Sequence, residues 1–206
     1  MRQNPARRTA LLDAAIEVLA REGSRGLTLR AVDKEAAVPT GTASNYFTNR
    51  TDMLAQVMRR TRERLTPDPA ELAGTMNAEP SHEVVRTLML QLVDRMRRDR
   101  SSHLAMLELR LEATRRPELH AELARFFTAE LDANIDFHLG HGLPGDRTGV
   151  LVLYLAMLGL IVDDLTVPEV LRPHRLDALI DTMVTRLLPA EARSAGRNAE
   201  ESTTSP

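Results

Sequence analysis

Apolar residues recur at spacings of three and four along most of the chain, and no segment shows the strict alternation typical of a β-strand. This periodicity predicts an all-α protein. The longer apolar stripes predict helices over residues 8–22, 81–99, 102–115, 117–139, 147–164 and 173–188. The residues after Pro189 show no periodicity and are predicted to form a disordered tail.

Turn signals divide residues 23–54 into short, closely spaced helices. Gly23 and Gly26 end the first helix, and Thr28 can cap the next one by accepting a backbone N–H bond. Pro39 ends that second helix, because proline disfavours helical geometry at the residue before it. A short helix, a tight turn and another short helix form the layout of a helix-turn-helix, whose second helix enters the DNA major groove.

The second helix of this pair is expected over Thr40–Phe47. Its exposed side carries short polar residues, which suit hydrogen bonding to base edges better than a hydrophobic face would. Asn49 can cap the following helix, with Asp52 in the first turn, where the helix dipole favours a carboxylate.

Charge is distributed unevenly along the chain. Residues 1–66 hold 12 basic and 7 acidic residues, whereas the remainder holds 15 and 22. A basic head suits a polyanion such as DNA, because displaced counterions then contribute to the affinity.

Composition limits the class of protein. The 206 residues include no cysteine, which excludes disulfides, thiolate metal sites and a cysteine nucleophile. The N-terminus lacks the apolar core of a signal peptide, and the longest apolar run, Val150–Val162, has 13 residues, fewer than the ~20 that span a bilayer. We therefore expect a soluble cytoplasmic protein without a membrane partner.

The N-terminal region resembles the DNA-binding domain of the TetR/AcrR family over residues 8–65. The resemblance is carried by Leu27-Thr28-x-Arg30, Val38-x-x-Gly41-Thr42 and Tyr46-Phe47-x-Asn49-Arg50-x-Asp52-x-Leu54. The chain departs from the family pattern where Asp33 replaces a common alanine, Ala37 a glycine, Ser44 an aromatic residue and Arg50 a lysine.

This resemblance implies a set of DNA contacts. Arg30, Thr40, Thr42 and Asn45 would reach bases or the groove from the polar surface that includes Ser44, and Thr28, Tyr46 and Arg50 would contact phosphates. Gly41 would let the backbone approach the duplex closely.

The last two helices are candidates for self-association. Val150–Val162 is apolar on all sides, and periodicity alone leaves core packing and a two-fold interface equally open. Similar proteins dimerise through a four-helix bundle of these helices, which favours the interface. Its expected residues are Val150, Leu153, Tyr154, Met157, Ile161, Leu176, Leu179, Ile180, Met183 and Leu187.

Similar proteins also bind a small molecule among the body helices and then lose affinity for DNA. The candidate ligand-binding residues here are Met89, Met96, His103, Met106, Glu108, Arg110, Phe126, Phe127 and Met157. Ordinary core packing is the alternative for the Met and Phe positions.

The sequence therefore predicts a DNA-binding head over residues 1–66, a ligand-binding and dimerisation body over 67–189, and a disordered tail over 190–206. We expect a ligand-responsive regulator, a repressor that binds a palindromic operator as a homodimer, with no cofactor or metal. A helical protein-binding adaptor is one alternative. A helical metalloenzyme is a weaker one, because its candidate ligands, Asp136, His138, His141 and Glu79-Pro-Ser-His82, lack the Glu-x-x-His pairs of di-iron bundles.

Overall fold

The computed structural model describes residues 4–189, and within this range every regular element is a helix. The head contains α1 (Pro5–Gly26), α2 (Leu29–Glu35), the 3₁₀ turn η1 (Ala43–Asn45) and α3 (Arg50–Leu65). The body contains α4 (Pro69–Met76), α5 (His82–Arg98), α6 (Arg100–Ala113), α7 (Pro117–Gly140), α8 (Arg147–Thr166), η2 (Pro168–Val170) and α9 (Leu176–Leu187). The predicted all-α class is confirmed, whereas the tail predicted over 190–206 lies outside the described residues.

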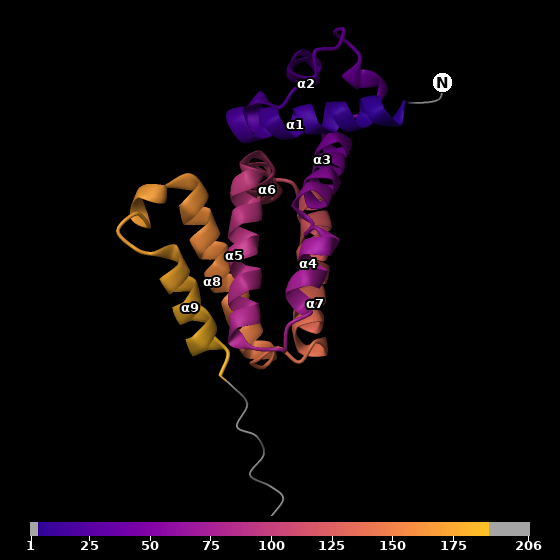
Figure 1. Ribbon diagram of the computed structural model, residues 1–206. Coiled ribbons are helices and arrows are strands. Elements are labelled where there is room, and N and C mark those ends of the chain that lie inside the picture. Colours follow the sequence, from indigo (N-terminus) through magenta and orange to yellow (C-terminus); the bar gives the residue numbers. More distant parts are fainter. Residues whose placement is uncertain (1–3, 190–206) are drawn as a thin grey trace, which may run out of the picture.

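The body helices stand side by side, and α1 lies across their upper ends, with α3 running down from the head (Figure 1). The caps expected from the sequence explain where the head helices begin. Thr28 accepts the N–H of Ala31 at 3.1 Å at the start of α2, and Asn49 accepts the N–H of Asp52 at 2.9 Å at the start of α3.

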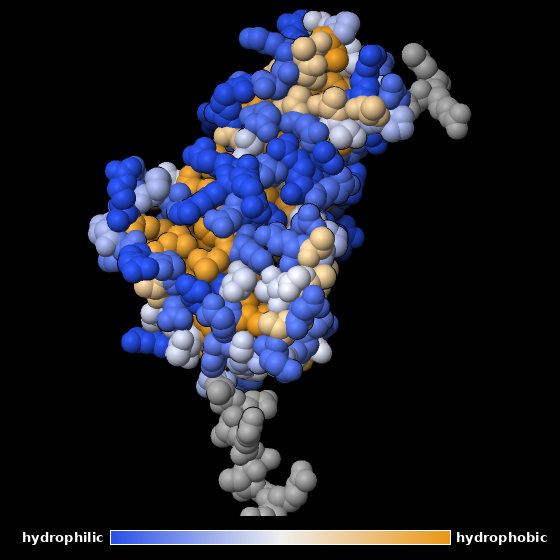
Figure 2. All heavy atoms as spheres, viewed as in Figure 1, coloured by the Kyte–Doolittle hydropathy of each residue, from blue (hydrophilic) through white to orange (hydrophobic). Residues whose placement is uncertain are grey.

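The body core joins side chains of α5, α8 and α9, among them Val85, Met157 and Ile180. Within residues 4–189, α8 alone is long and apolar enough to cross a membrane by length and composition, and 33% of its most apolar window is buried. One side of α8 packs in the body core, and the other carries Val152 and Leu155, which are 39% and 55% exposed. Figure 2 shows a hydrophobic patch over the part of the surface where α8 and α9 lie.

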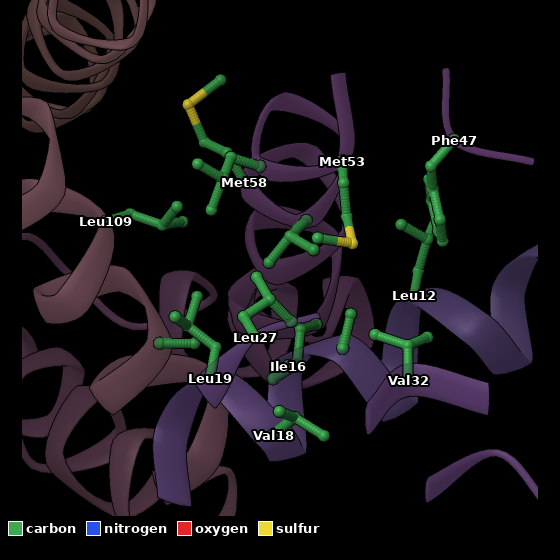
Figure 3. Close-up of a cluster of buried hydrophobic side chains, with 14 of the residues drawn as sticks. Leu12, Ile16, Val18, Leu19, Leu27, Val32, Phe47, Met53, Met58 and Leu109 are labelled. Atoms are coloured by element: carbon green, nitrogen blue, oxygen red, sulfur yellow. The ribbon is translucent and has the colours of Figure 1, made fainter. Parts of the chain in front are cut away.

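The head has its own hydrophobic core. The side chains of Ile16, Leu19, Leu27 and Met53 come from three segments and meet where α1 crosses α3, as Figure 3 shows. All of them are at most 1% exposed. Close packing of this kind fixes the position of α2 and the following turn relative to α3.

The head core does not end at the predicted boundary after residue 66. Ala105, Leu109 and Ala113 of α6 belong to the same buried cluster as the head residues, and so do Leu119 and Leu123 of α7. The helix α6 is therefore shared between the head and the body.

An ion-pair network reinforces this junction. Arg64 of α3 donates to both carboxylate oxygens of Asp99, at 2.9 and 2.8 Å, and lies 3.4 Å from Glu17 of α1. Asp99 also caps α6 by accepting from the N–H and the hydroxyl of Ser102, at 3.2 and 2.8 Å. Burial alone would raise the pKa of Asp99, but the hydrogen bonds from Arg64 and Ser102 more than offset this and hold that pKa below its ordinary value.

We expect Asp99→Ala to lower the free energy of unfolding by about 2–3 kcal/mol at neutral pH, because it removes a helix cap and leaves Arg64 without its main partner. A carboxylate with a lowered folded-state pKa stabilises the fold above its ordinary pKa, and this contribution disappears as pH falls through the folded-state pKa. The difference between wild type and variant should therefore shrink below about pH 4 in urea denaturation. Asp94→Ala, at an exposed position of α5, is the control and should change stability by less than about 0.5 kcal/mol. A difference that is independent of pH would contradict the assignment.

Candidate nucleic-acid interface and internal cavity

The segment expected to form a helix over Thr40–Phe47 is mainly a turn, so this prediction is wrong in its extent. Only Ala43–Asn45 has regular helical structure, and it is of the 3₁₀ type. The cause is Gly41, whose φ of 92° lies in the left-handed region and interrupts the helical path. The amides of Tyr46 and Phe47 both donate to the carbonyl of Ala43, so one helical turn does form after the glycine.

A buried carboxylate holds this turn in place. Asp33 of α2 is 2% exposed, and its two oxygens accept the N–H groups of Gly41 and Ala43, each at 2.7 Å. Charge-assisted bonds to backbone amides compensate for the burial of the carboxylate. The sequence showed Asp33 only as a departure from the family pattern. The family pattern could not reveal that the Asp33 carboxylate binds the amides of residues eight and ten positions later.

Ala37 completes the link between α2 and the turn. Its φ of 50° makes it the one non-glycine residue with positive φ between residues 4 and 189. This conformation costs an alanine roughly 1–2 kcal/mol, which explains why a glycine is usual at this place in the family pattern.

The polar residues of the turn face solvent and also brace the turn. Thr42 donates its hydroxyl to the carbonyl of Pro39 at 2.6 Å, and Ser44 donates to Gly41 at 2.6 Å. Asn45 donates its side-chain amide to the same Gly41 carbonyl at 3.2 Å. Most of the predicted DNA-contact residues are exposed, namely Thr28, Arg30, Thr40, Gly41, Ser44 and Asn45, and Thr42 is half-buried.

The environments of Arg50 and Tyr46 differ from those of the exposed candidates. The Arg50 guanidinium donates to the carbonyls of Leu27 and Ser24 and, at 2.9 Å, to the Ser24 hydroxyl. These bonds favour a structural role, joining α3 to the loop before α2, over the phosphate contact expected from the sequence. Tyr46 is half-buried against the head core, and its phosphate contact stays a prediction.

Much of the basic excess of the head is neutralised within the protein. Arg21 pairs with Glu35 at 2.8 Å, and Arg60 pairs with Asp13 at 2.8 Å. By contrast, the part of the chain that the structure describes offers no ion-pair partner within 4.0 Å to two exposed cations of α2, Arg30 and Lys34. Unpaired positive charge therefore lies on the surface that carries the polar turn.

Helices α3 to α8 all contribute residues to the wall of a cavity of about 560 Å³. Its lining includes the predicted ligand-binding residues Met89, Met96, His103, Met106, Arg110, Phe126, Phe127 and Met157. Glu108, which was also predicted to bind the ligand, does not line the cavity. Its carboxylate points toward the head and accepts the N–H of Ser24 at 3.2 Å. Arg62 and Arg95 also line the cavity but were not predicted from the sequence. An arginine beside an apolar stripe usually lies on the solvent-exposed side of its helix, so periodicity gave no reason to place either residue in a cavity.

Several polar side chains interrupt the largely apolar wall of the cavity. His103 is 8% exposed, and its Nε2 atom is buried without a hydrogen-bond partner among the described residues. Burial, together with the nearby charge of Arg110, lowers the pKa of His103, so its imidazole is neutral near pH 7. The Arg110 guanidinium carbon lies 3.6 Å from the centre of the Phe127 ring.

The predicted dimer interface needs correction. Val150, Leu153, Met157, Ile161 and Ile180 are all at most 7% exposed, because they face the core or cavity of their own subunit. A helix that is apolar all round gives no periodic signal to distinguish its inner and outer sides. The remaining predicted interface residues, Tyr154, Leu176, Leu179, Met183 and Leu187, are half-buried.

The histidines considered as metal ligands bind carbonyl groups instead. His138 Nε2 lies 2.8 Å from the carbonyl oxygen of Pro144, and His141 Nδ1 lies 2.7 Å from that of Phe137. No group of three or more His, Cys, Asp or Glu residues that could hold a metal ion occurs among residues 4–189. These contacts favour roles in ending α7 at the loop.

Two family models match the chain. Residues 11–57 match the bacterial regulatory proteins of the tetR family, and residues 80–190 match the tetracyclin repressor-like C-terminal domain. A comparison with curated proteins found no match.

Solved structures agree with this fold over nearly the whole chain. A TetR-family member from Streptomyces coelicolor A3, SCO1917, is 24% identical with a TM-score of 0.68, and the alignment covers 90% of this chain and 100% of that one. The multidrug binding protein EbrR in complex with imidazole is 25% identical with a TM-score of 0.65, covering 92% and 99% of the two chains. EbrR has also been solved with ethidium, at 25% identity and a TM-score of 0.63, covering 90% and 100%.

The two matched segments together include the polar turn with its buried Asp33 brace and four of the helices that line the cavity, α5 to α8. The chain therefore belongs to the TetR family of DNA-binding transcriptional regulators.

Proposed function

We propose that this TetR-family chain is a cytoplasmic, homodimeric repressor that binds a palindromic operator and is released by a small molecule in the body cavity. The observation that carries this proposal is the position of α6. One side of this helix belongs to the head core, and another side lines the cavity.

The exposed turn supports the DNA-binding part of the proposal. Arg30, Thr40, Thr42, Ser44 and Asn45 would read bases, Gly41 would allow close approach, and Thr28 and Tyr46 would contact phosphates. Arginine suits guanine and asparagine suits adenine in the major groove. The bonds from Asp33 fix the turn before DNA arrives, so little conformational entropy is lost on binding.

The exposed side of α8 supports a dimer. Val152, Leu155 and Gly159 follow one another at helical spacing, and a Cβ placed at Gly159 would meet no heavy atom within 4 Å apart from its chain neighbours and the backbone of its own helix. An apolar stripe with a small residue lets a second helix approach closely, and the half-buried Leu179 and Met183 of α9 extend the apolar surface. A two-fold copy of this surface would cover the patch and present two turns to successive major grooves, about 34–36 Å apart.

The contacts of α6 explain how a ligand would reach the DNA-reading head. Ala105 and Leu109 pack in the head core, whereas His103 and Arg110 line the cavity. Glu108 adds a bond to Ser24 at the end of α1. A molecule that enlarges or reshapes the cavity therefore displaces α6, and α1 has to follow because the two share a packed core.

A ligand acts in this way only through its different affinities for two conformations. The relative EbrR, described as a multidrug binding protein and solved with ethidium, supports a small-molecule role for the cavity.

Selection of bound duplexes from a random pool tests the DNA-binding proposal. We expect a palindrome whose half-sites are one helical turn apart, and loss of discrimination of about 1–3 kcal/mol at one position per half-site in Arg30→Ala. Arg125→Ala, an exposed arginine of α7, is the matched control and should select the wild-type sequence. No enrichment of any sequence would overturn the proposal, and an unchanged profile for Arg30→Ala would remove the role of that residue.

Asp33→Ala tests whether the braced turn is required. The change leaves the Gly41 and Ala43 amides without their acceptor, which should cost about 2–3 kcal/mol of stability and lower affinity for the selected operator more than tenfold. Fluorescence-anisotropy titration measures the operator affinity, and Glu118→Ala, which removes an exposed carboxylate from α7, should keep wild-type binding. Wild-type operator affinity in folded Asp33→Ala would show that the turn does not depend on this carboxylate.

A further inference from the structure

The charged groups of the cavity are not balanced. Its two carboxylates already have cationic partners, since Glu130 pairs with Arg62 at 2.7 Å and Glu71 lies 3.9 Å from Arg98. Arg95 and Arg110 line the same cavity, and neither forms an ion pair within the described part of the chain. The cavity wall therefore carries positive charge that the protein itself leaves uncompensated.

Arg95 is held by one backbone contact. Its Nε atom donates to the carbonyl of Leu65 at 3.1 Å, at the end of α3. Burial lowers the pKa of Arg95, and the attraction of Glu71 is opposed by the neighbouring Arg98. A guanidinium stays charged even so, because its ordinary pKa is far above neutrality.

Arg110 is positioned for recognition by its aromatic neighbour. The guanidinium stacks on the Phe127 ring at 3.6 Å and makes no hydrogen bond to any residue between 4 and 189. Stacking orients the planar group while its N–H donors remain available to a ligand at the edge.

His103 is a second polar residue of the cavity wall on the same side of α6. It lies seven residues before Arg110, which is about two helical turns, and both residues line the cavity. Its ring is neutral near pH 7, so it supplies no negative charge that would offset Arg110. The rest of the wall is largely apolar, with Met89, Met96 and Phe126 among its residues.

We propose that the cavity binds an amphiphilic organic anion, with its carboxylate or sulfonate at Arg110 and its hydrocarbon body against the apolar wall. Arg95 adds to the positive potential without needing to touch the anion. This inference rests on the proposed ligand-binding function and gives it a chemical class. The same charge distribution disfavours a cationic ligand such as ethidium. A cation would be repelled by Arg95 and Arg110, and neither carboxylate of the wall is free to bind it.

A charge series on one skeleton tests the inference. Calorimetric titration of the full chain with decanoate, decanol and decylammonium, each below its micelle concentration, compares three head groups on the same hydrocarbon. We expect decanoate to bind at least about tenfold more tightly than decanol, and decylammonium to bind most weakly.

Variants locate the anion. Arg110→Gln should remove the preference for decanoate over decanol and leave the affinity for decanol unchanged, which also shows that the variant is folded. Arg110→Lys should keep part of the preference, because it retains charge without the planar fork. Arg125→Gln removes an exposed charge from α7 as the matched control and should behave as wild type.

The contrary outcomes are distinct. Equal binding of decanoate and decanol would overturn the anion inference while leaving the cavity as a ligand site. Tightest binding of decylammonium would show a cation site. Failure of all three to bind would overturn this inference and count against the ligand-release part of the proposed function as well, whereas operator selection tests the DNA-binding part separately.

Discussion

The structure depends on one shared helix. Leu109 of α6 is fully buried in the head core, while His103 and Arg110 of the same helix line the body cavity. A close-packed helix cannot change its position against one set of neighbours without disturbing the other. The ion pair between Arg64 and Asp99 strengthens the junction, because Asp99 caps α6 and Arg64 belongs to α3, the helix that links head and body. The cavity wall and the head core, which holds the proposed DNA-reading turn, are therefore mechanically connected through α6.

At the other end of this connection, the turn has an internal brace in place of a long helix. The Asp33 carboxylate accepts two amides, and the hydroxyls of Thr42 and Ser44 close further bonds within the turn. Such a short element presents few side chains, so its exact placement decides which bases it can reach. In the proposed mechanism, a small displacement of α1 and α2 would be enough to change DNA affinity, because the turn does not adapt easily on its own.

Much of this arrangement could be predicted from local chemistry. The caps at Thr28 and Asn49 follow from residue type and spacing. The polar turn, and the eight predicted ligand-binding residues that line the cavity, follow from helical periodicity together with the family pattern. The predictions that failed depend on which neighbour a side chain faces, and helical periodicity does not determine this. Glu108 could face the cavity or the head, α8 could bury either side, and only three-dimensional proximity shows that Asp33 meets the amides of Gly41 and Ala43.

The most direct test of the account measures the distance between the two heads. The chain contains no cysteine, so Ala10→Cys on the exposed side of α1 gives a single spin-label site in each subunit. Pulsed electron paramagnetic resonance of the labelled protein bound to its selected operator should give one narrow distance population, and saturating decanoate should shift that population as the DNA is released. An unchanged distribution on release of the DNA, or no measurable distance between two labels, would contradict a dimer controlled through α6.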